Sequence, residues 1–104
     1  MLTINKSERL NLLGRILWDY NLSVEEADDV LQGHKDSVGH YKRESLFLKI
    51  IESYPWFTVI QLLPPEEVKQ LLTRHTIAQI RSISLRHKYE FVRKRLHRAL
   101  PTSG

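Results

Sequence analysis

The side chains with the clearest potential for chemistry in this sequence are four basic residues near its end: Arg86, Arg93, Lys94 and Arg98. At helical spacing they lie opposite an apolar stripe, so they form a basic face. Such a face can contact phosphates of DNA or RNA, because Arg and Lys displace condensed counterions, and Arg74 and Arg81 would then add to the contacts. It can instead dock on an acidic protein surface. Many basic helix faces are only solvated, so this interpretation also stays open.

The charge of the chain is unevenly distributed. Residues 1–73 carry eight Lys and Arg against eleven Asp and Glu, a formal net charge of −3. Residues 74–104 carry eight Lys and Arg against one Glu, a formal net charge of +7. The total charge of +4 therefore combines an acidic body with a basic C-terminal part. The acidic segment at residues 25–29 is a candidate partner for the basic face, within one chain or in another copy.

Other chemistry has little support. The histidines form no H-x-x-x-H pair beside an acid, and the chain has no cysteine, which excludes thiolate metal sites and thiol nucleophiles. No P-loop, G-x-S-x-G or G-x-G-x-x-G motif occurs. Asp28 and Asp29 are adjacent, so on a helix they point about 100° apart and indicate a solvated helix start. We therefore expect no enzyme activity, no cofactor and no metal.

Length and composition indicate one ordinary domain. The 104 residues are 41% hydrophobic and 27% charged, a balance typical of globular proteins. No apolar run approaches the roughly 20 residues that span a bilayer, and residues 1–13 lack the apolar stretch of a secretory signal. We expect a cytoplasmic protein with no membrane contact.

The apolar periodicity predicts an all-α fold, a compact orthogonal bundle of about five or six helices in a single domain over residues 1–104. Ser7 is the expected N-cap of the first helix, and Ser23 with Glu26 forms a capping box before the second. Residues 34–40 are expected to form a loop. The expected helices cover residues 8–20, 24–32, 41–54, 56–63, 65–72 and 77–100.

The last predicted helix is long and basic, and its apolar stripe changes direction near Ser82 and Ser84. The stripe is formed first by Ile77, Ile80 and Ile83 and then by Leu85, Tyr89, Val92, Leu96 and Leu100. We expect the helix to bend or break near these serines, or to pack against different neighbours along its length. Residues 65–98 also match a helix-turn-helix, with residues 73–76 as the turn and Gln79 and Arg81 near base edges. Two amphipathic helices with a short turn occur in every helical bundle, so this match is not specific.

A family resemblance rests on four strings: LWDY at residues 17–20, LFLKIIESY at 46–54, WFTVIQLL at 56–63 and PEEVKQLL at 65–72. Their order resembles small bacterial helical proteins of unknown function that open on an L-W-D motif. Some of these resemble antitoxin-like partners of nucleotidyltransferase toxins. The resemblance covers residues 17–80 and implies a non-enzymatic protein that binds a partner. It carries over no site residue, and the basic stretch at 86–98 departs from the pattern.

These observations predict a non-enzymatic binding protein, a small antitoxin-like or regulatory subunit that engages a protein partner or forms a homo-oligomer. This hypothesis predicts an exposed apolar patch beside the basic face. The alternative is a nucleic-acid-binding protein that uses the basic C-terminal helix.

Overall fold

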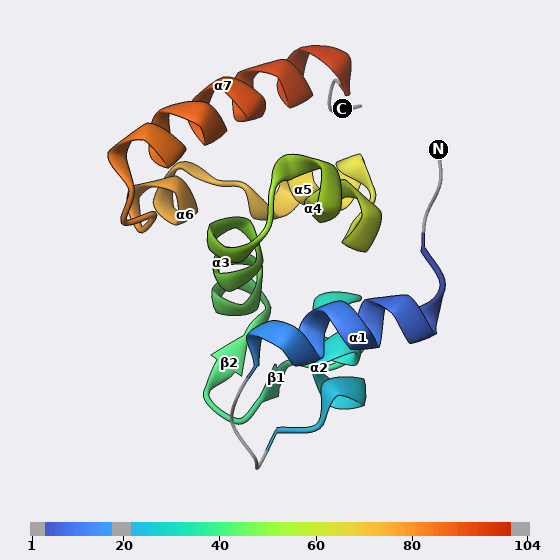
Figure 1. The fold of residues 1–104 in the computed structure, drawn as a ribbon. Helices are drawn as coiled ribbons and strands as arrows, with labels where there is room; N and C mark the ends of the chain where they lie inside the picture. The colour runs from blue at the N-terminus through green and yellow to red at the C-terminus, as the bar shows by residue number, and fades with distance from the viewer. Residues whose placement is uncertain (1–3, 18–21, 101–104) are drawn as a thin grey trace. The chain divides into compact units, whose positions relative to one another are not determined.

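A computed structural model describes residues 4–17 and 22–100 and shows an all-α fold, as predicted (Figure 1). The described residues form seven helices and one pair of two-residue strands. The chain divides into two compact units, Met1–Leu63 and Pro64–Gly104. No helix in the described ranges is long and apolar enough to cross a membrane.

The first unit is built from helices that contact one another in sequence order, with α1 also contacting α3. Its fully buried side chains include Leu13, Leu31 and Phe47, which come from α1, α2 and α3. The elements are α1 (Lys6–Ile16), α2 (Val24–Leu31), β1 (Ser37–Val38), β2 (Tyr41–Lys42), α3 (Arg43–Ser53) and α4 (Trp56–Leu62).

The start of α1 differs from the sequence prediction. Its N-cap is Asn5 and not Ser7, because the Asn5 Oδ1 accepts a hydrogen bond from the Glu8 N–H at 2.9 Å. The helix ends at Ile16, four residues before the predicted end. Residues 18–21, which carry most of the L-W-D motif, lie outside the described residues. The start of α2 is confirmed, since the Ser23 Oγ accepts from the Glu26 N–H at 3.3 Å.

The expected loop at 34–40 contains half of a β-hairpin. Val38 pairs with Tyr41 and Ser37 pairs with Lys42, in antiparallel register. Gly39 makes the turn with a φ of +58°, a conformation that side chains other than glycine seldom adopt. Because Tyr41 and Lys42 pair in the hairpin, α3 begins two residues later than predicted.

Part of the acidic α2 is paired within the first unit. Asp28 is buried, and its two carboxylate oxygens accept from the Arg9 Nε at 2.9 Å and Nη2 at 3.1 Å. Glu26 forms an exposed ion pair with Lys35 at 2.6 Å. The prediction that Asp28 is only a solvated helix start is therefore wrong, because Arg9 of α1 lies across from it and compensates its burial.

The second unit consists of α5 (Pro65–Leu71), α6 (Arg74–Ala78) and α7 (Ile83–Ala99), and α7 contacts both other helices. The predicted turn at 73–76 is wrong, because the Thr73 side chain caps α6 by accepting from the Thr76 N–H at 3.1 Å. The predicted helix at 77–100 breaks, because the Ser82 Oγ accepts from the Leu85 N–H at 3.2 Å and starts a new helix.

Candidate functional site

The basic helix α7 has one buried side and one exposed side. Tyr89 and Leu96 are its buried side chains, and Arg86 and Arg93 lie half-buried at the border of that side. At about 3.6 residues per turn, Lys94 and Arg98 fall on the opposite side, where they are exposed. The four predicted site residues therefore do not share one face.

Three of those four residues line a pocket of about 430 Å³ between α6 and α7, and Arg98 does not. The pocket lining combines four cations, one carboxylate and two apolar side chains. These residues are Arg74, Ile77, Ala78, Arg86, Glu90, Arg93 and Lys94.

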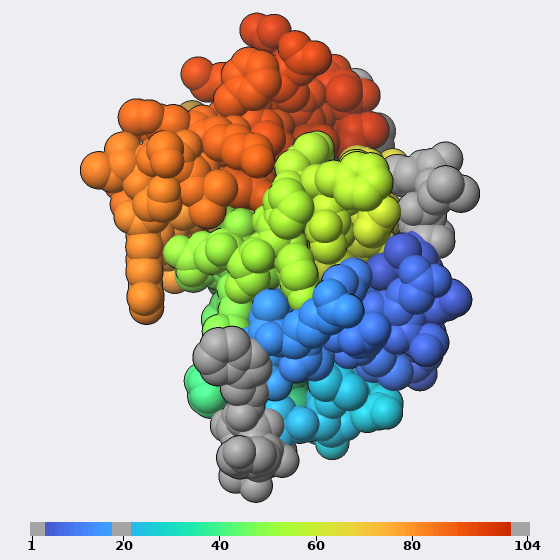
Figure 2. Space-filling model, in the orientation of Figure 1, coloured from blue at the N-terminus to red at the C-terminus, as the bar shows by residue number. Residues whose placement is uncertain are grey.

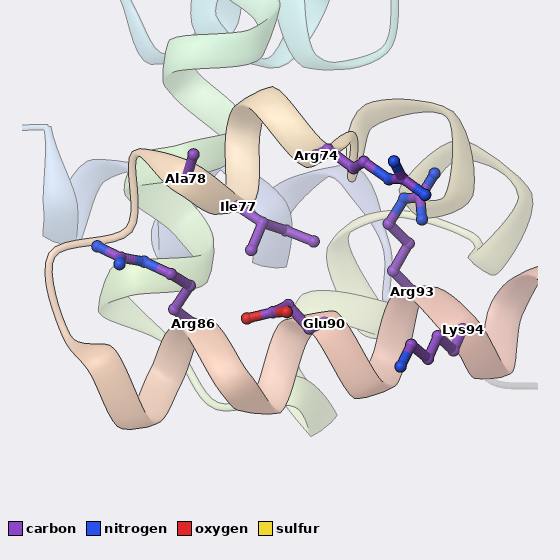
Figure 3. A pocket seen from close by; sticks show the side chains of 7 residues that line it. All are labelled: Arg74, Ile77, Ala78, Arg86, Glu90, Arg93 and Lys94. Carbon is purple, nitrogen blue, oxygen red and sulfur yellow. The ribbon is translucent and has the colours of Figure 1, made fainter.

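Arginines from both helices converge at one end of this pocket. Figure 3 shows the side chains of Arg74, from α6, and Arg93, from α7, reaching toward each other. Arg86 occupies the opposite end, and Glu90 lies between the two ends. The break between α6 and α7 produces this arrangement, because it turns α6 back against the flank of α7. The sequence places Arg74 in the predicted turn at residues 73–76, and that prediction does not bring Arg74 close to Arg93.

The cations at the Arg74 end lack acidic partners. Within residues 4–17 and 22–100, none of Arg74, Arg93 and Lys94 forms an ion pair. The Arg93 Nε is buried and has no hydrogen-bond partner in this part of the chain. Partial desolvation and the charges of Arg93 and Lys69 lower the pKa of the neighbouring His97. This end of the pocket is therefore a region of positive potential.

Arg86 has a different environment. Its Nε and Nη2 donate to the backbone carbonyl of Ile80 at 3.3 and 2.8 Å. Ile80 is fully buried and lies in the connection between the two helices. Arg86 therefore fixes the connection between α6 and α7 beside the pocket, and only its other N–H groups remain for a ligand.

Tyr89 is fully buried on the inner side of α7. Desolvation raises its pKa to about 12, because burial disfavours the phenolate. The phenol therefore stays neutral at physiological pH and belongs to the packing of α7.

The exposed side of α7 carries two large apolar residues among cations. Ile83 is 64% exposed and Phe91 is 61% exposed. The Arg95 guanidinium lies 5.6 Å from the centre of the Phe91 ring, within the range of a cation–π contact. In the space-filling view many α7 side chains, coloured orange to red, lie at the surface (Figure 2). The sequence prediction placed Ile83 on the apolar stripe that faces the core, which is wrong because Ile83 is exposed, and it did not single out Phe91.

In the described part of the chain, no cluster of three His, Asp or Glu side chains is arranged to hold a metal ion. Comparison of the chain with models of known protein families, with curated proteins and with solved structures finds no match.

Proposed function

We propose that this protein is a non-enzymatic binding protein, a small antitoxin-like or regulatory subunit, which docks an acidic protein partner on the outer face of α7. One observation carries the proposal: Ile83 and Phe91 are both more than 60% exposed on a helix side rich in cations. We call this surface, formed by Ile83, His87, Phe91, Lys94, Arg95 and Arg98, the outer face.

The spacing of the two apolar residues suits a docking helix. Ile83 and Phe91 are eight residues apart, so they lie about two turns apart and about 80° around the helix axis. Helices that dock on a partner present apolar anchors at this kind of spacing, and aromatic residues are enriched among binding hot spots. A phosphate backbone offers no matching contact for Ile83, which favours a protein partner over nucleic acid.

The charge of the outer face specifies an acidic partner. Lys94, Arg95 and Arg98 form no ion pair in the described residues, so their charges are available at the rim of the apolar anchors. Complementary charge accelerates association and rejects basic competitors.

A separate protein suits this surface better than a second copy of the chain. The acidic α2 was the candidate surface on another copy, but Asp28 is buried against Arg9 and Glu26 pairs with Lys35. The resemblance over residues 17–80 is to small bacterial helical proteins of unknown function, some of which resemble antitoxin-like partners, and it implies the same kind of role, a small subunit bound to a different protein.

Nucleic-acid binding through α7 is the second candidate function. It is favoured by six Lys and Arg against one Glu within Ile83–Ala99. The helix begins at Ile83, so a helix-turn-helix would place Ser84, His87 and Lys88 near base edges in place of Gln79 and Arg81. This candidate predicts binding that weakens steeply as salt rises.

Photocrosslinking in the source cells tests the protein-partner proposal. A photoreactive amino acid is placed at position 91, with position 57 as the matched control, because Phe57 is 68% exposed on α4. We expect one acidic protein to crosslink at position 91 and not at position 57, and Ile83→Ser to abolish that crosslink. Crosslinks to nucleic acid alone, or equal labelling at both positions, would contradict the proposal.

A further inference from the structure

We infer that the pocket between α6 and α7 binds a phosphorylated small molecule, with its phosphate group between Arg74 and Arg93. This inference goes beyond the proposed docking of a protein, because the pocket lies on the flank of α7 and shares only Lys94 with the outer face. The two proposals can therefore fail independently.

The net positive charge of the pocket lining favours an anionic ligand. Its lining holds four cations and one carboxylate. Arg74 and Arg93 point toward each other from separate helices, and no ion pair in the described residues compensates either of them (Figure 3). Two converging guanidinium groups repel one another. An anion bound between them attracts both groups and offsets this repulsion.

The guanidinium of Arg93 is incompletely hydrogen-bonded. Buried donors are nearly always hydrogen-bonded, but the Arg93 Nε is buried and has no partner within the described chain. Because the Nε is shielded, the anion would contact the other N–H groups of this guanidinium. The planar guanidinium presents several N–H groups that match the oxygens of a phosphate, and such charged hydrogen bonds are about twice as strong as neutral ones. A carboxylate has two oxygens and a charge of −1, whereas a phosphate monoester has three terminal oxygens and more negative charge to share between the two arginines.

The size and remaining lining of the pocket specify the rest of the ligand. A volume of about 430 Å³ falls in the range of small-molecule sites and exceeds what a bare phosphate needs. Ile77 and Ala78 offer an apolar contact to the body of the ligand. The Glu90 carboxylate accepts hydrogen bonds and repels a second phosphate, so we expect a phosphate monoester on a body that carries hydroxyl groups.

Calorimetric titration of the full chain tests this site with four probes: a nucleoside 5′-monophosphate, ribose 5-phosphate, inorganic phosphate and the nucleoside alone. We expect the two monoesters to bind, inorganic phosphate to bind more weakly and the nucleoside not to bind. Arg74→Ala should raise the Kd at least tenfold, and the variant should fold because Arg74 is exposed. Arg98→Ala is the matched control, with a change below twofold.

The pKa of His97, followed by NMR, locates the bound ligand. A phosphate against Arg93 offsets the charge that lowers this pKa, so the His97 pKa should rise on saturation. Phe91→Ser should leave monoester binding unchanged even if it abolishes partner docking. The inference is overturned if no monoester binds at millimolar concentration, if Arg74→Ala and Arg98→Ala weaken binding equally, or if the His97 pKa stays constant. Tighter binding of a short RNA than of any monoester, with loss in Arg98→Ala, would identify a nucleic-acid contact and also overturn it.

Discussion

Arg86 of α7 holds the buried backbone carbonyl of Ile80 with two donors, Nε at 3.3 Å and Nη2 at 2.8 Å. The contact joins the start of α7 to the connection that follows α6. It keeps α6 folded back beside α7, so that Arg74 and Arg93 come from separate helices to one pocket. Arg86 is thus a positioning residue for the site that it borders.

Replacing Arg86 should loosen this connection. Arg86→Ala leaves the Ile80 carbonyl without its two donors in a buried place, which costs about 1–3 kcal/mol of unfolding free energy. Arg86→Lys supplies one point-like donor and should recover only part of that loss. Urea denaturation of the three proteins measures the effect. Equal stability of Arg86→Ala and the wild type would show that the contact contributes nothing to the fold.

Breaking the buried ion pair of the first unit should lower the unfolding free energy more than replacing Arg86 does. Asp28 has a side chain 3% exposed, and Arg9 is its charged partner. Arg9→Met leaves that carboxylate buried and unpaired, so we expect a loss of about 3–5 kcal/mol. The double variant Arg9→Met, Asp28→Leu should recover most of it, because the burial of an uncompensated charge is gone. A loss in the double variant as large as that of Arg9→Met alone, measured by the same denaturation, would contradict this explanation.

Tyr89 predicts a loss of stability in alkali. An unfolded tyrosine ionises near pH 10, and burial raises the pKa of Tyr89 in the folded chain to about 12. Between these pH values the unfolded chain binds fewer protons than the folded chain. The unfolding free energy that depends on a neutral Tyr89 is therefore fully present below about pH 10, and it is lost as the pH rises toward 12. At about pH 11.5 the loss should reach about 2 kcal/mol. Tyr89→Phe should lack this part of the pH dependence. If the unfolding free energies of the variant and the wild type fall equally between about pH 10 and 12, Tyr89 is not the group responsible.

Two glycines predict opposite outcomes on replacement by alanine. Gly39 has a φ of +58°, and a Cβ there would lie 2.5 Å from the Leu22 Cδ2, so Gly39→Ala should cost about 1–2 kcal/mol. Gly14 lies within α1, where a Cβ would meet, among the described residues, the Val24 Cγ1 at 3.7 Å. Gly14→Ala should therefore add about 0.5–1 kcal/mol, because alanine favours the helix. Thermal unfolding should show a lower Tm for Gly39→Ala and a higher Tm for Gly14→Ala than for the wild type.

The sequence predicts the helices that have clear local signals and misses what depends on distant contacts. Ser23 caps α2, and Pro55 and Pro64 precede α4 and α5, because caps and prolines act on neighbouring backbone. The break before α7 was indicated by the change in apolar direction, but its position depends on the Ser82 cap and on Arg86. The hairpin at residues 37–42 is too short to produce a pattern of alternating residues.

The candidate site was predicted only in part for the same reason. The sequence identified α7 and named all four pocket cations among the expected phosphate contacts. The convergence of Arg93 with Arg74 follows from the packing of α6 on the flank of α7, and no spacing along the chain encodes it. The exposure of Ile83 and Phe91 was missed, because an apolar residue in a helical pattern is equally compatible with burial.

The affinity of two matched variants for the protein crosslinked at position 91 tests the central claim most directly. Phe91→Ser and Phe57→Ser each remove one exposed phenylalanine, from α7 and from α4. Calorimetry should show that Phe91→Ser raises the Kd for that partner at least tenfold, about 1.4 kcal/mol, whereas Phe57→Ser changes it less than twofold. Equal Kd values for Phe91→Ser and the wild-type chain would contradict the docking of a protein partner on the outer face of α7.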